Sequence, residues 1–179
     1  MLTAIDLREP DMVPITDLAM DPPIIERITG IRLEGFSFVG GARGERAWEN
    51  SVREVSALVE ACKRLDFDAV NIEDYILASR DYTPKFIAED TFVDEWGRVL
   101  RIRNDTKTTW WVDGIIRTRE DLDGWEPPNP NAPGRMEILE RAIKEIKGEM
   151  ATMGYIHVAF HFAWQIRGGL DKFIKDLYL

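Results

Sequence analysis

Two adjacent acids end one of the most apolar stretches of the sequence. Residues 67–76 (FDAVNIEDYI) run apolar and β-branched and then place Glu73 and Asp74 side by side. A carboxylate at the end of a buried strand can act as a general acid or base, and it can equally be a solvated strand end. Because side chains alternate along a strand, Asp74 shares a face with Ile72, whereas Glu73 points the other way. Only one of the two can therefore face a site.

Other ionisable side chains fall near the ends of predicted strands. Asp17 ends a β-branched run over residues 12–18 with Asp21 just beyond, and His161 lies near the end of an apolar run over residues 153–164. In parallel α/β folds, ligands bind at the carboxyl ends of the strands. Asp17 and His161 are therefore candidate site residues beside the paired acids.

The two histidines of the chain, His157 and His161, lie four residues apart. On a helix this spacing places both on one face, ready to hold a metal ion, whereas on a strand they stand about 13 Å apart. The neighbouring Val158 and Phe160 favour a strand. His157 is therefore interpreted as a structural residue, and no metal shared by the pair is expected.

Two further clusters favour structural roles. Arg43 and Arg46 lie beside glycines in "GGARGERAW", but the spacing of a phosphate-binding loop is missing, which favours an exposed loop. Four tryptophans gather in the segment that follows the second predicted strand. They are expected to pack that segment onto the protein rather than to stack a ligand. These are Trp96, Trp110, Trp111 and Trp125.

The elements that would position these groups alternate between strands and helices. After a short helix closed by Gly30, apolar residues recur at three- and four-residue steps from Trp48 to Leu65, which predicts an amphipathic helix of about five turns. This helix leads into the strand at residues 67–76, as in a βαβ unit. A helix over residues 135–150, the strand over residues 153–164 and a last helix from Gly168 follow.

A different pattern separates the second strand from the next helix. Apolar and basic residues alternate over residues 99–103, "NDTK" supplies a turn and "TTWWV" follows. This predicts an antiparallel hairpin insert at about residues 90–117. A proline-rich acidic connector over residues 120–134 shows neither a helical nor a strand period.

The predicted fold is α/β, a single domain over residues 1–179 that forms part of a (β/α)8 TIM barrel with the hairpin inserted. A complete barrel typically takes about 250 residues, and only three barrel strands are predicted before Leu179. We therefore expect an incomplete barrel, either the front part of a larger one or a truncated reading frame. Its open edges would leave apolar surface for self-association.

The composition and net charge of the chain exclude some classes of binding partner. With 45% hydrophobic and 31% charged residues the chain can bury a core, and 23 basic against 32 acidic residues give a net charge of −9. That balance argues against nucleic acid and anionic membranes as partners. No apolar run approaches the roughly 18 residues of a membrane span, and no signal peptide is recognised. The single Cys62 excludes an internal disulfide and a zinc site with several thiolates, so a cytoplasmic setting is expected.

The order of motifs resembles the uroporphyrinogen decarboxylase (URO-D) superfamily, which also contains cobalamin-dependent methyltransferases. The resemblance rests on "REPDMVPITDLAMDPPIIERITG", "LDFDAVNIEDYI" and "DEWGRVLRIR", and it extends through "TREDLDGWEPPNPNAPGR" to "QIRGGLDKFIKDLYL". It looks like the amino-terminal half of a family member. It implies that Asp74 matches the acid that the decarboxylases carry at the end of the second barrel strand.

The resemblance implies two enzymatic functions. The decarboxylases bind tetrapyrrole carboxylates through an arginine-rich segment after the first strand, whereas residues 15–25 here carry Asp17 and Asp21 and contain no arginine, the next one being Arg27. This charge argues against a tetrapyrrole carboxy-lyase. The opening resembles the methyltransferase and demethylase branch better, which implies a small-molecule substrate or corrinoid protein as partner, with corrinoid and zinc as cofactors. That branch holds zinc through its carboxy-terminal half, so no metal ligand is assigned in this chain.

A third hypothesis belongs to another class. The chain would do no chemistry alone and would act only through association with another chain, because an unclosed barrel exposes unpaired strand edges.

Overall fold

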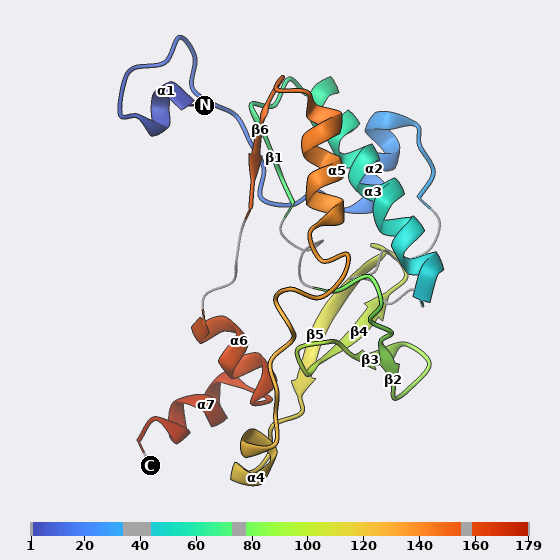
Figure 1. Ribbon diagram of the computed structural model, residues 1–179, viewed down its shortest axis with the longest axis vertical. Helices are drawn as coiled ribbons and strands as arrows, with labels where there is room; N and C mark the ends of the chain where they lie inside the picture. The colour runs from blue at the N-terminus through green and yellow to red at the C-terminus, as the bar shows by residue number, and fades with distance from the viewer. Residues whose placement is uncertain (1, 34–43, 73–77, 155–158, 179) are drawn as a thin grey trace.

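The computed structural model describes residues 2–33, 44–72, 78–154 and 159–178. It is an elongated molecule with two parts along its long axis (Figure 1). Its elements are α1 (Leu2–Ile5), α2 (Pro22–Thr29), α3 (Gly44–Arg64), β1 (Ala69–Asn71), β2 (Lys85–Phe86), β3 (Thr91–Val93), β4 (Arg98–Arg103), β5 (Thr108–Gly114), α4 (Arg119–Asp123), α5 (Glu137–Ile146), β6 (Ala151–Met153), α6 (Ala159–Ile166) and α7 (Leu170–Asp176).

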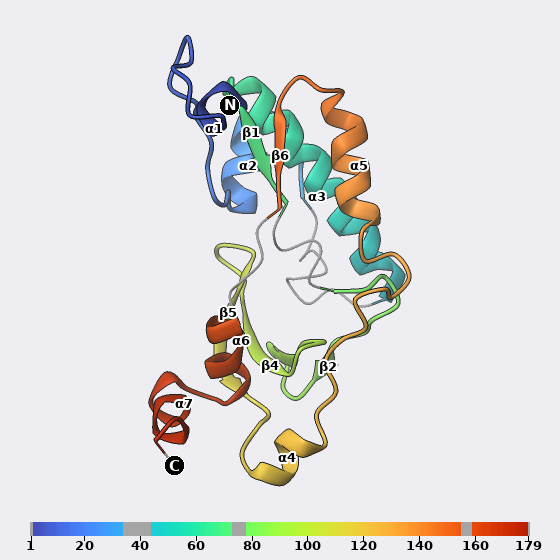
Figure 2. The same cartoon turned by 60° about the vertical axis from the view of Figure 1, so that its left-hand side comes forward.

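The first part, here called the helical part, contains α2, α3, α5 and the parallel pair β1–β6. Strand β1 pairs with β6 from Ala69 opposite Ala151 to Asn71 opposite Met153. The three helices lie on one side of these strands (Figures 1 and 2). Their apolar faces form the main core of the molecule. Fully buried members are Ile25, Val55, Ala57, Ala61, Val70, Ile72, Ile138, Ala142 and Ile146.

Helix α3 confirms the amphipathic helix that the sequence predicts. Val55, Val59 and Cys62 lie on its buried face at helical spacing. Helix α2 ends at Gly30, whose φ of 75° is the left-handed conformation that a glycine C-cap adopts without steric cost. The apolar spacing of α3 and the glycine cap of α2 could be predicted from the sequence because each signal lies within or directly beside one element.

The second part, here called the sheet part, is built on a four-stranded antiparallel sheet in the order β2-β3-β4-β5. The predicted hairpin is confirmed in β4 and β5, with Arg101 opposite Trp110 and an irregularity between Val99 and Leu100. Helix α6 packs on this hairpin: the Trp111 and Trp164 rings meet edge to face at 4.8 Å, and Trp111 Nε1 donates to the Gln165 carbonyl at 3.0 Å.

Two ion pairs connect distant segments of the chain. Lys107, in the turn between β4 and β5, binds Glu26 of α2 at 2.7 Å and also donates to the Leu33 carbonyl. The hydrogen bond from Lys107 is the main reason that the pKa of Glu26 is lowered. Arg135, just before α5, binds Glu95 at 2.8 Å. The first pair joins the β4–β5 hairpin to α2, and the second joins the connector to the turn between β3 and β4.

The predicted (β/α)8 barrel is wrong. The described residues form a two-stranded parallel sheet and a separate four-stranded antiparallel sheet, and neither continues a barrel. A parallel pair was expected and β1–β6 is parallel, but only Met153 of the expected third strand belongs to it, and the described residues of the first expected strand form no strand.

The first expected strand, residues 12–18, lies beside β1 without forming a ladder. Asp68 N donates to the Ile15 carbonyl, but the amides of Ile15 and Leu18 bind carboxylates, on Asp68 and Asp17 respectively. Pro14 has no amide hydrogen to contribute. Side-chain acceptors and a proline therefore replace the backbone pairing that a strand needs.

The third expected strand, residues 153–164, is divided. Only residues up to Met153 belong to β6, and α6 begins at Ala159. Short apolar runs do not distinguish a strand from a buried helix by period alone. Contacts with the hairpin decide the outcome, because the adjacent α6 residues Trp164 and Gln165 both meet Trp111.

The acidic connector contains one short helix that its composition concealed. Helix α4 begins at a capping box in which Thr118 Oγ1 accepts from Asp121 N and the Asp121 carboxylate accepts from Thr118 N. The sequence T-x-x-D carries this signal in the form known for helix starts.

Candidate functional site at the carboxyl ends of the parallel strands

Three chain segments meet where β1 and β6 end. Asn71 and Met153 are the last paired residues of the two strands. Thr16 lies across this edge and donates to the Ala69 carbonyl at 3.1 Å. The carboxyl ends of parallel strands are the usual place for ligands in α/β proteins. We call this edge, made of Thr16, Asp17, Leu18, Asn71 and Met153, the carboxyl-end edge.

Asn71 is the most unusual polar side chain at the carboxyl-end edge. The residue is 9% exposed, and its Nδ2 donates to the Leu18 carbonyl at 2.5 Å. Its Oδ1 is buried and has no hydrogen-bond partner among the described residues. A buried acceptor left unpaired costs about 1–3 kcal/mol. The edge therefore offers an acceptor for an N–H or O–H group.

Asp17 adds a carboxylate to the same edge. Its side chain is exposed, and Oδ1 accepts from the Leu18 amide at 2.7 Å. Burial, with the Asp17 charge as a second cause, raises the pKa of the Cys62 thiol to about 11. Cys62 is therefore a protonated, buried thiol at neutral pH, which suits neither a nucleophile nor a metal ligand.

The other predicted site residues divide into two groups. Asp74, Glu73, His157 and Arg43 lie outside the described residues, as does the side chain of Arg46. His161 lies on α6 rather than at a strand end, and its ring meets Trp164 at 5.2 Å. Burial and then the Arg98 charge lower the pKa of His161. The structure thus places His161 in the sheet part and Asp17 in the helical part.

Two buried arginines in the sheet part were missed by sequence reasoning. Arg98 Nε binds Asp94 at 2.6 Å, and its guanidinium lies 5.0 Å above the Phe162 ring centre. Arg135 binds Glu95, the neighbour of Asp94. Because each guanidinium already faces a carboxylate, these groups do not offer a free anion site. The motif "DEWGR" carried the signal, since it holds both acids and one arginine.

The tryptophans behave largely as predicted. Trp96 stacks on Phe162 with ring centres 4.7 Å apart, and Trp125 Nε1 donates to the Trp96 carbonyl. Trp111 packs on α6 as described above. Trp110 is the exception, because 66% of it is exposed on the outer face of β5.

The described residues do not fit the zinc site that the resemblance implies. Within them, no group of three or more His, Cys, Asp or Glu side chains is placed to hold a metal ion. Cys62, the only cysteine, is buried and protonated. No helix in the described part of the chain combines the length and apolar character needed to cross a bilayer. No family model, curated protein or solved structure matches the chain.

Proposed function

We propose that this protein takes part in corrinoid-dependent methyl transfer as a relative of the methyltransferases and demethylases of the URO-D superfamily. Its small-molecule substrate would bind at the carboxyl-end edge, in a cytoplasmic setting. The observation that carries the proposal is the buried Asn71 Oδ1, which has no partner among the described residues, on a side chain whose Nδ2 donates to the carbonyl of Leu18, the residue after Asp17. Asp74 follows Asn71 by three positions in the sequence.

Each residue of the proposed site has a chemical role. Asn71 Oδ1 accepts a hydrogen bond from the substrate and orients it. Asp74 acts as the general base or acid that accepts or returns the substrate proton, and Asp17 adds negative charge that favours a protonated or cationic group. His161 is left out, because it packs against Trp164 on α6.

The charge of the edge favours methyl transfer over tetrapyrrole decarboxylation. Asp17 is exposed there, and Arg27, the first arginine after it, lies on α2. A substrate with many carboxylates would meet a carboxylate at this edge rather than guanidinium groups, which is unfavourable. A neutral or cationic methyl acceptor or donor suits the edge better.

The test is a methyl-transfer assay that does not require zinc. The protein is incubated with methylcobalamin and N-acetylcysteine at pH 7, where most of the thiol is protonated and a base must take its proton before the sulfur accepts the methyl group. Loss of the methyl group is followed by corrinoid absorbance. We expect the protein to accelerate the transfer. We expect Asp74→Asn to reduce that acceleration by about 100-fold, the usual size of a general acid–base contribution.

The control variant is Asp105→Asn, which removes an exposed acid from the turn between β4 and β5. It should leave the rate unchanged. Release of carbon dioxide from uroporphyrinogen, without methyl transfer, would establish the decarboxylase function instead. If neither reaction is accelerated, the proposal fails.

A further inference from the structure

The chain exposes more surface than a folded monomer of its mass. Its accessible surface is 11112 Å² for 20.6 kDa. The scaling of surface with mass gives about 8,900 Å² for a compact monomer of that size. The excess of roughly 2,200 Å² is more than the approximately 800 Å² that each partner buries in a standard interface. The elongated shape therefore leaves an area large enough for a stable association.

Part of this excess lies on the N-terminal arm, residues 2–13. Helix α1 has no buried residue, and the arm makes local contacts, such as Asp6 N to the Leu2 carbonyl and Arg8 to Asp6. Its apolar side chains are strongly exposed, with Leu7 96% accessible. The exposed apolar residues of the arm are Leu2, Ile5, Leu7, Met12 and Val13. Such a run is a typical protein-binding surface.

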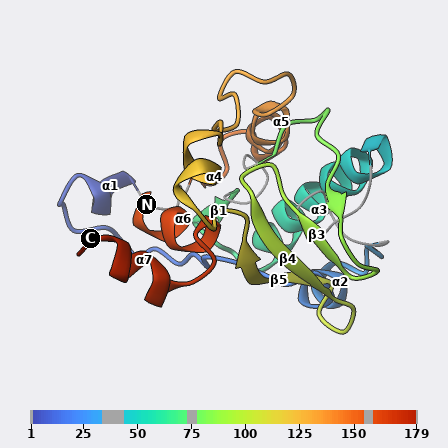
Figure 3. The same cartoon turned by 90° about the horizontal axis from the view of Figure 1, so that it is seen from below.

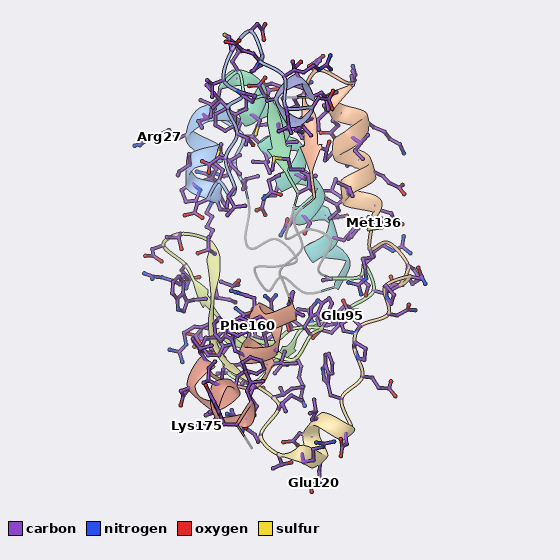
Figure 4. All side chains as sticks on the ribbon, turned by 90° about the vertical axis from the view of Figure 1, so that its left-hand side faces the viewer. Arg27, Glu95, Glu120, Met136, Phe160 and Lys175 are labelled. Atoms are coloured by element: carbon purple, nitrogen blue, oxygen red, sulfur yellow. The ribbon has the colours of Figure 1, made fainter. Side chains whose placement is uncertain are left out.

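A second apolar surface lies on the C-terminal helices, residues 159–178. Helix α7 has no buried residue, and Phe173 meets Phe160 edge to face at 5.4 Å. Figure 4 shows this face, with Phe160 and Lys175 labelled on it. Its exposed apolar residues are Phe160, Leu170, Ile174, Leu177 and Tyr178.

The two surfaces lie on the same side of the molecule at opposite ends of its long axis. Figures 1 and 3 both show α1 and α7 on the left, and Figure 1 places them at the top and bottom of that side. A two-fold axis perpendicular to the long axis would bring the arm of one copy against α7 of another. Twofold pairing makes the same contact twice, which is the commonest arrangement of homodimers.

The charges of the two surfaces are complementary. The arm carries Asp6, Glu9 and Asp11 against Arg8, a net charge of −2. The C-terminal helices carry three basic residues against two acids, a net charge of +1: Arg167, Lys172 and Lys175 against Asp171 and Asp176. Opposite charges around an apolar contact steer association and fix its register.

We propose that two copies of this chain associate about such an axis, with the N-terminal arm of each copy packed on the C-terminal helices α6 and α7 of the other. The proposal is independent of the enzymatic function, because neither surface contains Asp17, Asn71 or Asp74.

Cysteine cross-linking tests this arrangement directly. Cys62, the only native cysteine, is buried, so introduced thiols react selectively. Leu7→Cys chains are mixed with Leu177→Cys chains and treated with a flexible bis-maleimide. We expect a cross-linked pair of the two variants. The matched control mixes Leu7→Cys with Ile87→Cys, which places an exposed thiol in the turn between β2 and β3 on the other side of the molecule.

A charge introduced at the contact gives an independent measurement. Leu177→Asp removes an exposed apolar side chain, so the monomer should fold normally. We expect its dimer dissociation constant to rise by roughly tenfold or more, while Ile87→Asp changes it by less than about twofold. Equal cross-linking in both mixtures, or equal dissociation constants for both variants, would overturn the proposal.

Discussion

The neighbouring acids Asp94 and Glu95 bind two different arginines in the sheet part. Asp94 accepts from the Arg98 amide and binds its guanidinium, whereas Glu95 binds Arg135 and the amide of Ser79. These contacts join the β3–β4 turn, the segment after residue 78 and the start of α5. Because the pairs are buried, removing one partner leaves an uncompensated charge.

Arg135→Met should therefore destabilise the protein by about 3–5 kcal/mol. Both side chains of the Arg135–Glu95 pair are largely buried, 7% and 14% exposed. Urea denaturation followed by tryptophan fluorescence measures the loss. The control is Arg80→Met, whose pair with Glu137 is solvent-exposed, and which should have a much smaller effect. Equal effects of the two variants would contradict the structural role of Arg135.

His161 predicts a pH dependence of stability. Burial and the Arg98 charge lower its pKa in the folded state, so the folded protein prefers the neutral ring. This contribution is complete above the unfolded pKa of about 6.5 and is lost as pH falls from that value through the lower folded pKa. His161→Gln should lose less stability than the native chain between pH 7.5 and pH 5.5, measured as the urea midpoint at each pH. An identical loss in both proteins would show that His161 does not contribute.

At the scale of elements, local patterns predicted well and tertiary ones did not. Helix α3 and the β4–β5 hairpin follow from spacing and turn residues within one segment. Residues 12–18 do not form a strand, because the Asp68 and Asp17 carboxylates take amides that a ladder would need. Residues 159–166 form a helix, because they pack on Trp111 far back in the sequence. Asp68 and Trp111 lie outside the segments that they affect, so their influence cannot be predicted from those segments alone.

In the candidate site too, features set by local sequence could be predicted, and features set by tertiary contacts could not. Strand alternation over residues 67–76 led to the acids that follow β1, which lie outside the described residues. Asp17 follows Thr16, whose hydroxyl donates to the Ala69 carbonyl of β1. The role of Asn71 could not be predicted, since its bond to Leu18 depends on how residues 15–18 cross the strand end. His161 was assigned to a strand end and lies on a helix instead.

Gly114→Ala tests the contact between β5 and α6. A Cβ at this position would overlap the backbone carbonyls of Gln165 and Ile166. Backbone cannot move aside as a flexible side chain does, so we expect the free energy of unfolding to fall by about 1–3 kcal/mol in urea denaturation. Gly154→Ala is the matched control, because nothing lies within 4 Å of the added carbon. Native-like stability of Gly114→Ala would mean that α6 is not held against β5 in this way.

At the scale of the whole molecule, the elongated shape leaves apolar surface exposed at both ends of one side. The helical part has a shared core, but the N-terminal arm and the C-terminal helices extend from the body on one side (Figure 1). Their apolar side chains would be covered if two copies paired about a two-fold axis. Such pairing would bury part of the excess surface without changing either fold.

The mass in solution tests this account most directly. Sedimentation equilibrium across micromolar concentrations should give twice the chain mass of 20.6 kDa, and Leu177→Asp should shift the distribution toward the single chain. A native protein that stays at 20.6 kDa throughout that range would contradict the paired arrangement.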